Sequence, residues 1–419
     1  MIGEERALKG PENKPLMWIC ALLVLIGAVA FLFGISGPQA QRAWQAYLIN
    51  FLFWSGLAFG TVLFVAILNM TNARWARPMK RMAEAPVAFL PISFGLFWVL
   101  YLGRGEIFPW ISEPVSGKEG WLDVGFLFAR DGAGLFLLTA LSIALVYHSV
   151  RRDLALASEH VAIGQGRGPV SGTGIPLGNK GSDKGWRAQI VLSPILGILY
   201  PLVLSLLAFD LIMSLDPHWN STLFGAYYFV GSFYTALAAI VIIAGISRMN
   251  VGLRPFILPR HFHDLGKLLL GFCLLTGDFF YSQFLVIWYG NLPEEAKYVI
   301  LRIRQWPWEP LAWIVLVVCF AIPFVVLLSR KIKMKPGPMM VLSCIILAGM
   351  WLERFLLVTP SLWGGEGFPL GFQEALITAG FLGAWALSVM VFLSKFPALP
   401  LSDPLFREAL EEEVPKRNA

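Results

Sequence analysis

The sequence predicts an all-α polytopic membrane protein with about ten transmembrane helices. Hydrophobic residues make up 57% of the 419 residues and charged residues only 14%, whereas soluble domains contain about 25% charged residues. Apolar stretches of about 20 residues recur along the chain, and a helix of that length crosses a hydrocarbon core of about 30 Å. The basic residues behind the net charge of +6 lie between these stretches, a pattern typical of membrane loops and not of nucleic-acid binding.

Ten stretches are long and apolar enough to span a membrane. Their predicted bounds are 15–35, 44–70, 82–102, 123–149, 187–214, 220–247, 265–290, 309–330, 338–358 and 371–394. Most of the 33 lysines and arginines lie in the N-terminal segment, the even-numbered loops and the C-terminal segment, which predicts that both termini are cytoplasmic. The first stretch is too long for the apolar core of a signal peptide, so it is predicted to be retained as a span.

A weak internal repeat predicts how the spans are grouped. Asp210 and Pro217 near the end of the fifth span have the same spacing as Glu353 and Pro360 near the end of the ninth. A repeat of four spans preserves orientation, which predicts two parallel four-helix bundles, spans 2–5 and 6–9, with two flanking helices. The predicted divisions are 1–43 (N-terminus and first span), 44–214 (first bundle), 215–358 (second bundle) and 359–419 (last span and C-terminal tail).

The loops on the two sides differ in composition. The glycine-rich loop 153–186 does not match a phosphate-binding motif and is predicted to be a flexible cytoplasmic linker. On the other side, Pro293 followed by Glu294 and Glu295 is typical of a helix start and predicts a short surface helix over 293–305. Many tryptophans lie near the outer ends of spans. They are typical of an interfacial aromatic belt, although a docking face for extracytoplasmic partners is an alternative interpretation.

Several ionisable residues lie well inside the predicted spans. They are Arg130 and Asp131 in the fourth span, Asp210 in the fifth, Asp278 in the seventh, and Glu353 and Arg354 in the ninth. Charges inside a membrane are costly and often functional. Structural ion pairs are the alternative, and because adjacent helical residues point in different directions, the partners could come from other helices.

Asp278 is the deepest of these residues. It lies about 16 Å along the helix axis from Lys267, near the middle of the membrane, and it shares a helical face with Tyr281 and Ser282. Removal from water disfavours the charged carboxylate. Asp278 is therefore predicted to be a proton carrier within the membrane, with Tyr281 and Ser282 as hydrogen-bonding relays.

Three further residues could pass protons at the membrane surfaces. Asp216 and His218 lie in the short outer loop after the fifth span, and histidine titrates near neutral pH. The same Asp-Pro-His-Trp string could equally form a turn that starts the next helix. His148 lies at the inner end of the fourth span, where it could admit protons or simply face the lipid headgroups.

The sequence contains no redox-centre motif. None of the five histidines lies deep within a span, no CxxCH haem-attachment motif occurs, and the four cysteines have no iron–sulfur spacing. The chain is therefore predicted to bind no metal and no covalent cofactor of its own.

Three segments resemble a known family. RAWQAYLINFLFWSGLAFGTVLF, FDLIMSLDPHWNSTLFGAYYFVGSF and FFYSQFLVIWYGN are similar to the ActF-like membrane subunits of bacterial alternative complex III, within the NrfD/PsrC-like family of quinone-interacting membrane proteins. The resemblance extends over nearly the whole chain, and the SLDPHW string is its most specific part. The family fold of ten helices with two four-helix bundles agrees with the grouping above.

The resemblance implies a subunit of a quinol:cytochrome c oxidoreductase complex in the bacterial inner membrane. The implied partners are a related NrfD-like membrane subunit, an iron–sulfur subunit, and multihaem and monohaem cytochrome c subunits, so haem c and iron–sulfur clusters belong to partners. Quinol would be oxidised near the outer side, mainly at the related membrane subunit. The ActF-like subunit would supply a proton route, with Asp210, Asp131 and Glu353 as an outer cluster and Arg130 and Arg354 as their charge partners.

Two other classes of function fit the same features. One is a secondary transporter whose buried carboxylates bind a coupling ion between the two bundles. Prolines inside the spans do not fall at matching places in the two halves, which disfavours it. The other is a structural anchor for extracytoplasmic redox subunits, with every buried charge satisfied by an ion pair.

Overall fold

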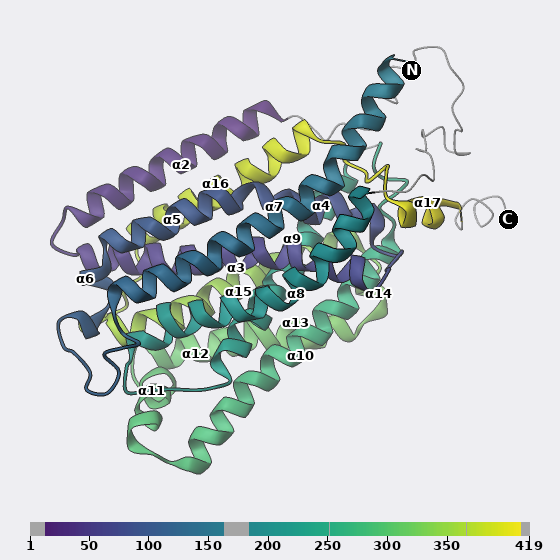
Figure 1. The fold of residues 1–419 in the computed structure, drawn as a ribbon. Helices are drawn as coiled ribbons and strands as arrows, with labels where there is room; N and C mark the ends of the chain where they lie inside the picture. Colours follow the sequence, from purple (N-terminus) through teal and green to yellow (C-terminus); the bar gives the residue numbers. More distant parts are fainter. Residues whose placement is uncertain (1–12, 163–183, 251, 366, 412–419) are drawn as a thin grey trace.

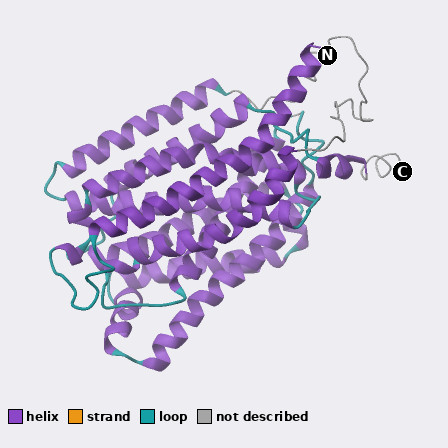
Figure 2. Cartoon of the chain, viewed as in Figure 1, coloured by secondary structure: helices purple, strands orange, loops and turns teal. Residues whose placement is uncertain are grey.

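The computed structural model describes residues 13–162, 184–250, 252–365 and 367–411. This described part is 82% helical and contains no strand (Figure 2). It contains ten helices that are long and apolar enough to cross a membrane, as the sequence predicts. The predicted glycine-rich linker falls largely on residues outside the described ranges.

The ten spans follow one another along the chain with short connections. They are α2 (Lys14–Ile35), α3 (Ala40–Met70), the composite η1–α4–η2–α5 (Arg77–Met79, Lys80–Glu84, Ala85–Phe89 and Leu90–Leu102), α7 (Val124–Ala162), α8 (Lys184–Leu211), α9 (Phe224–Arg248), α10 (Pro259–Gly290), the composite α12–η5–α13 (Trp308–Leu316, Val317–Ala321 and Ile322–Leu328), α15 (Pro336–Leu362) and α16 (Phe372–Lys395). The connecting helices are α6 (Arg104–Ile107), η3 (Pro109–Ile111), η4 (Met213–Leu215), α11 (Pro293–Arg304), α14 (Arg330–Lys333) and α17 (Pro404–Glu411). The surface helix predicted over 293–305 is thus confirmed as a helix, α11.

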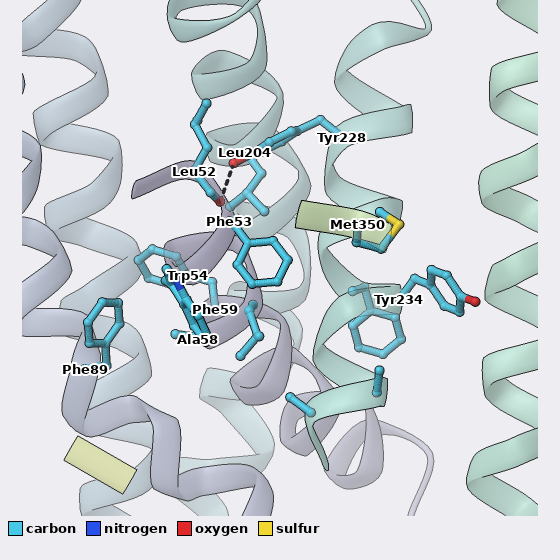
Figure 3. Close-up of a cluster of buried hydrophobic side chains, with 14 of the residues drawn as sticks. Leu52, Phe53, Trp54, Ala58, Phe59, Phe89, Leu204, Tyr228, Tyr234 and Met350 are labelled. Carbon is cyan, nitrogen blue, oxygen red and sulfur yellow. Dashed lines mark hydrogen bonds between the residues drawn. The ribbon is translucent and has the colours of Figure 1, made fainter. Parts of the chain in front are cut away.

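Helices α3 and α9 form the centre of the molecule. Small residues let their backbones approach closely, because a Cβ atom added at Gly60 would lie 2.7 Å from the Cβ of Ala236. Gly56 faces Ser232 in the same way one turn along, the pattern of small residues common where membrane helices pack. The Tyr228 hydroxyl donates to the Leu52 carbonyl across this contact at 3.0 Å (Figure 3).

The remaining spans surround this centre. Helix α3 also packs against α5 and α8, and α7 contacts α5 and α8. Helix α9 packs against α10 and α15, and the composite eighth span contacts α10 and α15. Helices α2 and α16 lie side by side at the edge (Figure 1). The division into two parallel bundles related by an axis stays a prediction.

The spans run between two ends of the molecule. The terminal side is the end where α2 begins and α16 ends, and α17 lies there (Figure 1). The opposite side carries α6 and α11. The terminal side holds a buried cluster of charges, most of them outside the predicted spans: Arg77, Lys80, Arg81, Glu84, Asp153 and Asp403.

Asp403 fastens the C-terminal segment into this cluster. Its Oδ2 accepts from Lys80 Nζ at 2.7 Å and from Arg77 at 2.9 Å. Burial alone would raise the pKa of Asp403, but Lys80 and Arg77 outweigh it and hold that pKa below its ordinary value. The carboxylate is therefore held ionised between two cations.

The lowered pKa predicts how docking of the C-terminal segment depends on pH. Because the folded-state pKa lies below the unfolded value of about 3.9, the stabilisation is present above that value and is lost as pH falls through the folded pKa. We expect Asp403→Asn to cost about 1–3 kcal/mol, since Arg77 also bonds Asn69 and Lys80 also bonds Gln189. Limited proteolysis at neutral pH should cut the C-terminal segment faster in the variant, and equal cutting rates would contradict the prediction.

Candidate functional site

Asp210 and Arg130 form a buried ion pair between α8 and α7. Arg130 Nε donates to Asp210 Oδ2 at 2.6 Å and its Nη2 donates to Oδ1 at 2.5 Å. Trp121 completes the arrangement, because its indole N–H donates to Oδ1 at 2.9 Å and its ring lies under the guanidinium at 3.8 Å. Arg130 thus pairs with a carboxylate on another helix rather than with its sequence neighbour.

Asp131 is left without such a partner. It is 1% exposed, and neither of its carboxyl oxygens has a hydrogen-bond partner among the described residues. It interacts electrostatically with both Asp210 and Arg130, and it lies close enough to the Asp210 carboxylate to donate a hydrogen bond to it when protonated. A buried carboxyl group without a hydrogen bond is costly, so a proton, a water molecule or both would satisfy it.

A line of polar side chains runs from Asp131 along the buried face of α7. Thr139, Ser142, Ser149 and Asp153 are all buried, and at about 100° per residue they lie with Asp131 within about 80° of one another around the helix. The buried Leu135, Leu138 and Leu145 lie between them on the same face. Asp131 and Asp153 are about 33 Å apart along the axis, which is close to the thickness of a hydrocarbon core. The hydroxyl groups of Thr139 and Ser142 have no hydrogen-bond partner among the described residues.

A second pair of hydroxyls lies at the level of the middle of this line. The Ser55 and Ser93 hydroxyls, on α3 and α5, are hydrogen-bonded at 2.6 Å and buried. The rings of Phe94 and Phe136 pack 5.9 Å apart, which places Ser93 within about a turn of the level of Thr139. Helices α3, α5 and α7 therefore carry polar groups between the charged groups at the two ends of α7.

The line ends on the terminal side in a second charged group. Arg81 bonds both Glu84 and Asp153, and its Nη1 lies 3.5 Å from the Ser149 hydroxyl. One oxygen of Glu84 is buried with no hydrogen-bond partner among the described residues. Each end of the line thus combines an arginine, its paired carboxylate and an unsatisfied carboxyl oxygen.

Glu353 and Arg354 form a second ion pair within α15. Arg354 Nη1 donates to Glu353 Oε2 at 2.5 Å, and the guanidinium lies 4.4 Å from the ring of Tyr228. Oε1 of Glu353 is buried and has no hydrogen-bond partner among the described residues. The Tyr227 hydroxyl lies close enough to the Glu353 carboxyl group to donate a hydrogen bond to it.

Glu353 lines a cavity of about 140 Å³ between α9, α10, α11, α12 and α15. Its walls include the apolar residues Phe224, Ile287, Val315, Phe320, Met350 and Leu356, and the polar residues Tyr227, Thr276, Gln283, Arg302 and Glu353. Phe280 and Leu316 also line it and are exposed on the outer surface of the helices. The cavity therefore combines an apolar, lipid-facing rim with a carboxyl group at its wall.

The helix that forms one wall is irregular. Residues Val317–Ala321 form a π-helical turn between α12 and α13, and Cys319 and Phe320 of this turn line the cavity. The Cys319 carbonyl accepts from the Tyr234 hydroxyl at 3.3 Å and lies 3.7 Å from Cys273 Sγ. Side chains thus satisfy a carbonyl of the turn, and π-bulges of this kind occur often at functional sites.

A stack of three side chains closes the cavity on the opposite side. The rings of Trp219 and Tyr298 are parallel at 3.7 Å, and Arg302 lies 3.4 Å from the Tyr298 ring. Arg302 Nε donates to the Leu356 carbonyl at 3.1 Å. That carbonyl would ordinarily accept from the residue four positions later, which is Pro360 and has no N–H.

Arg302 therefore replaces the donor that Pro360 lacks, and this predicts a compensating pair of substitutions. We expect Arg302→Met to destabilise the protein by about 1–3 kcal/mol because buried carbonyls lose their donor. Pro360→Ala in the same chain restores a backbone N–H and should recover part of that loss. Thermal unfolding in mild detergent measures both, and a double variant no more stable than Arg302→Met would contradict this explanation.

The structure places the other predicted site residues apart from these clusters. Asp278 and Tyr281 are exposed on α10, Ser282 is half-buried, and none of the described residues pairs with Asp278. His218 is exposed in the loop before α9, while Asp216 is half-buried and interacts electrostatically with Arg302. His148 is half-buried on α7 beside Tyr147.

Sequence reasoning missed several residues that the structure brings together. Trp121 is one of the tryptophans near span ends that are predicted as an interfacial belt, and Arg302 lies in the segment 293–305 that is predicted only as a surface helix. On the terminal side, Arg81 lies just outside the predicted third span and Glu84 lies just inside it, and neither is predicted as a site residue. The charged segment PMKRMAEAP at the start of this apolar run is a signal that could have identified both.

No protein-family model matches this chain, and no curated protein matches it at a significant level.

Proposed function

We propose that this chain is the proton-conducting membrane subunit of a quinol:cytochrome c oxidoreductase complex, with the terminal side in the cytoplasm of a bacterium. The observation that carries the proposal is the polar line on α7 from Asp131 to Asp153, with charged groups at both ends. Its unsatisfied carboxyl and hydroxyl groups are the partners that bound water needs. A chain of water molecules and hydroxyls can pass protons because each member both donates and accepts.

Each charged end of the route supplies one group that would exchange protons with water. On the opposite side, the Arg130–Asp210 pair is neutral as a unit and leaves Asp131 free to exchange a proton with water. On the terminal side, Glu84 has an unsatisfied oxygen beside Arg81 and is the group in the corresponding position. The ion pairs fix the positions of the exchanging groups without themselves needing to titrate.

The cavity at Glu353 supports a second function, binding of the quinol ring. Apolar cavities of about 150 Å³ accommodate a benzene ring, and the exposed rim at Phe280 and Leu316 would let an isoprenoid tail extend into lipid. Oε1 of Glu353 would accept a hydrogen bond from one quinol hydroxyl and would receive the proton of that hydroxyl on oxidation, while the proton of the second hydroxyl would leave to water on the same side. Electrons would pass to metal centres of partner subunits.

The carboxylate at the cavity predicts a specific effect on quinol affinity. We expect Glu353→Gln to raise the KM for quinol by about 10-fold or more, because the quinol hydroxyl would donate to a neutral amide oxygen instead of a charged carboxylate. The matched control is Glu374→Gln, which removes another buried carboxylate that pairs with Arg42 far from the cavity. Steady-state quinol oxidation by the purified complex measures both, and equal KM values in the two variants would contradict quinol binding here.

The sequence resemblance supports the assignment of partners. The implied complex contains a related NrfD-like membrane subunit, an iron–sulfur subunit, and multihaem and monohaem cytochrome c subunits, which carry the haem c and the clusters. The quinone-interacting and proton-conducting roles are those that the resemblance implies for this type of subunit. A secondary transporter would need none of these partners. A structural anchor would need the partners but no proton route.

Purification through a tag on this chain in mild detergent tests membership in the complex. The expected result is a reduced-minus-oxidised spectrum with strong c-type haem bands, together with quinol-dependent reduction of cytochrome c. A colourless preparation from cells that express the partners would contradict the proposal and favour the transporter.

A further inference from the structure

Asp278 lies on a face of α10 that the rest of the chain leaves uncovered. Residues that line the cavity, such as Cys273, Thr276 and Phe280, define the inward face of α10. At about 100° per residue, Asp278 points to the other side of the helix. Gly271 and Leu274 share this outward face and are exposed, and nothing lies within 4 Å of a Cβ added at Gly271.

The depth of Asp278 makes exposure to lipid costly. The residue is about 16 Å along the helix from Lys267 and about 18 Å from Gly290, so it is near the middle of the span. A carboxylate there costs about 2.5–3.5 kcal/mol on insertion scales. Charged residues at such depth almost always pair with another group rather than face hydrocarbon.

We propose that the outward face of α10 around Asp278 binds a transmembrane helix of another subunit that presents a lysine or arginine at mid-membrane depth. Charge complementarity selects this partner, because the carboxylate needs a cation and none of the described residues supplies one. The absence of a side chain at Gly271 lets a neighbouring helix approach closely on the same face. The inference does not depend on the proton route or on quinol binding.

A second copy of this chain fits the face poorly. A two-fold contact through α10 would bring two Asp278 carboxylates together, and like charges in a membrane repel. Each copy would also leave the other without a basic partner. Lys267 shares this face but lies about 16 Å from Asp278 along the axis and pairs with Asp264, so it cannot reach the carboxylate of a parallel copy. Leu274 and Tyr281, which lie nearer, carry no positive charge.

Photo-cross-linking in native membranes tests the proposal. A photoreactive residue at Leu274, one turn from Asp278, should give one protein adduct whose mass-spectrometric peptide is a transmembrane segment with a lysine or arginine in its middle. The same photoreactive residue at Ile198, which is 66% exposed on α8, should not give this adduct. An adduct with a second copy of this chain, adducts with lipid alone, or a partner segment without a basic residue would each overturn the proposal.

Substitutions at Asp278 separate pairing from folding. Asp278→Leu removes the charge without burdening insertion, and it should lower the adduct yield at Leu274 at least tenfold while the chain stays inserted. Asp278→Lys should also abolish the adduct, and exchange of the partner's basic residue for aspartate should restore it. Ile198→Lys controls for the cost of a lysine in the membrane and should leave the adduct intact. An unchanged adduct in Asp278→Leu, or no rescue by the charge exchange, would overturn the proposal.

Discussion

Replacement of Arg130 by leucine is expected to lower the free energy of unfolding by about 3–5 kcal/mol. The substitution would leave the Asp210 carboxylate, which is 0% exposed, without its bidentate partner. Trp121 would keep one hydrogen bond to Oδ1, but a single neutral donor cannot offset a buried negative charge. Asp131 would add to the loss, because a second carboxyl group interacts with the same site.

A double variant separates the cost of leaving the Asp210 charge unpaired from the cost of losing the other contacts of Arg130. Arg130→Gln with Asp210→Asn removes both charges together and should recover most of the stability, since no uncompensated charge remains. Arg104→Leu is the matched control, because it removes a surface arginine on the same side and should change stability by about 0.5 kcal/mol or less. The midpoint of thermal unfolding in mild detergent is the measurement. Equal midpoints for Arg130→Leu and Arg104→Leu would contradict the structural role of the pair.

The second large effect is expected at Asp131. In the purified complex, Asp131→Asn should slow proton-coupled turnover by about 100-fold, the lower end of what a positioned proton-transfer group contributes. An amide keeps the size of the side chain but cannot release and recover a proton. Because an asparagine amide can still donate to the Asp210 carboxylate beside it, the variant should fold and assemble about as well as the wild type.

The controls for Asp131 test charge and position separately. Asp131→Glu keeps a titratable group and should retain part of the activity. Glu119→Gln removes an exposed carboxylate on the same side and should leave the activity unchanged. Quinol-dependent cytochrome c reduction and a pH-sensitive dye together report turnover and proton release. Full coupled activity in Asp131→Asn would exclude Asp131 from the route.

The sequence predicts the spans well because long apolar stretches can only be satisfied in a membrane or a core. It could not predict which charges pair. Arg130 is adjacent to Asp131 in the sequence, but the packing of α7 against α8 brings Asp210 to it instead. Asp403 pairs with Arg77 across 326 positions of sequence, and charges near a span end ordinarily indicate a solvated loop.

The face that a helical residue presents is also missing from the sequence. Asp278 was predicted as a proton carrier from its depth alone, and depth is a property of sequence position. Whether it faces the bundle depends on which side of α10 packs against α9 and α13, and the structure turns Asp278 outward. Thr139 and Ser142 are not predicted as site residues, because isolated hydroxyl groups in an apolar run indicate no site until the face that they share is known.

Replacement of the two unsatisfied hydroxyls on α7 tests the proton route most directly. Thr139→Val with Ser142→Ala keeps the shape of the helix and removes two buried polar groups that have no hydrogen-bond partner among the described residues. If these hydroxyls only fill space, their loss should leave function unchanged and should increase stability. The route instead predicts that the intact complex in sealed vesicles moves protons at least tenfold more slowly while it remains assembled. Proton movement at the wild-type rate, measured with a pH-sensitive dye during quinol oxidation, would contradict the route along α7.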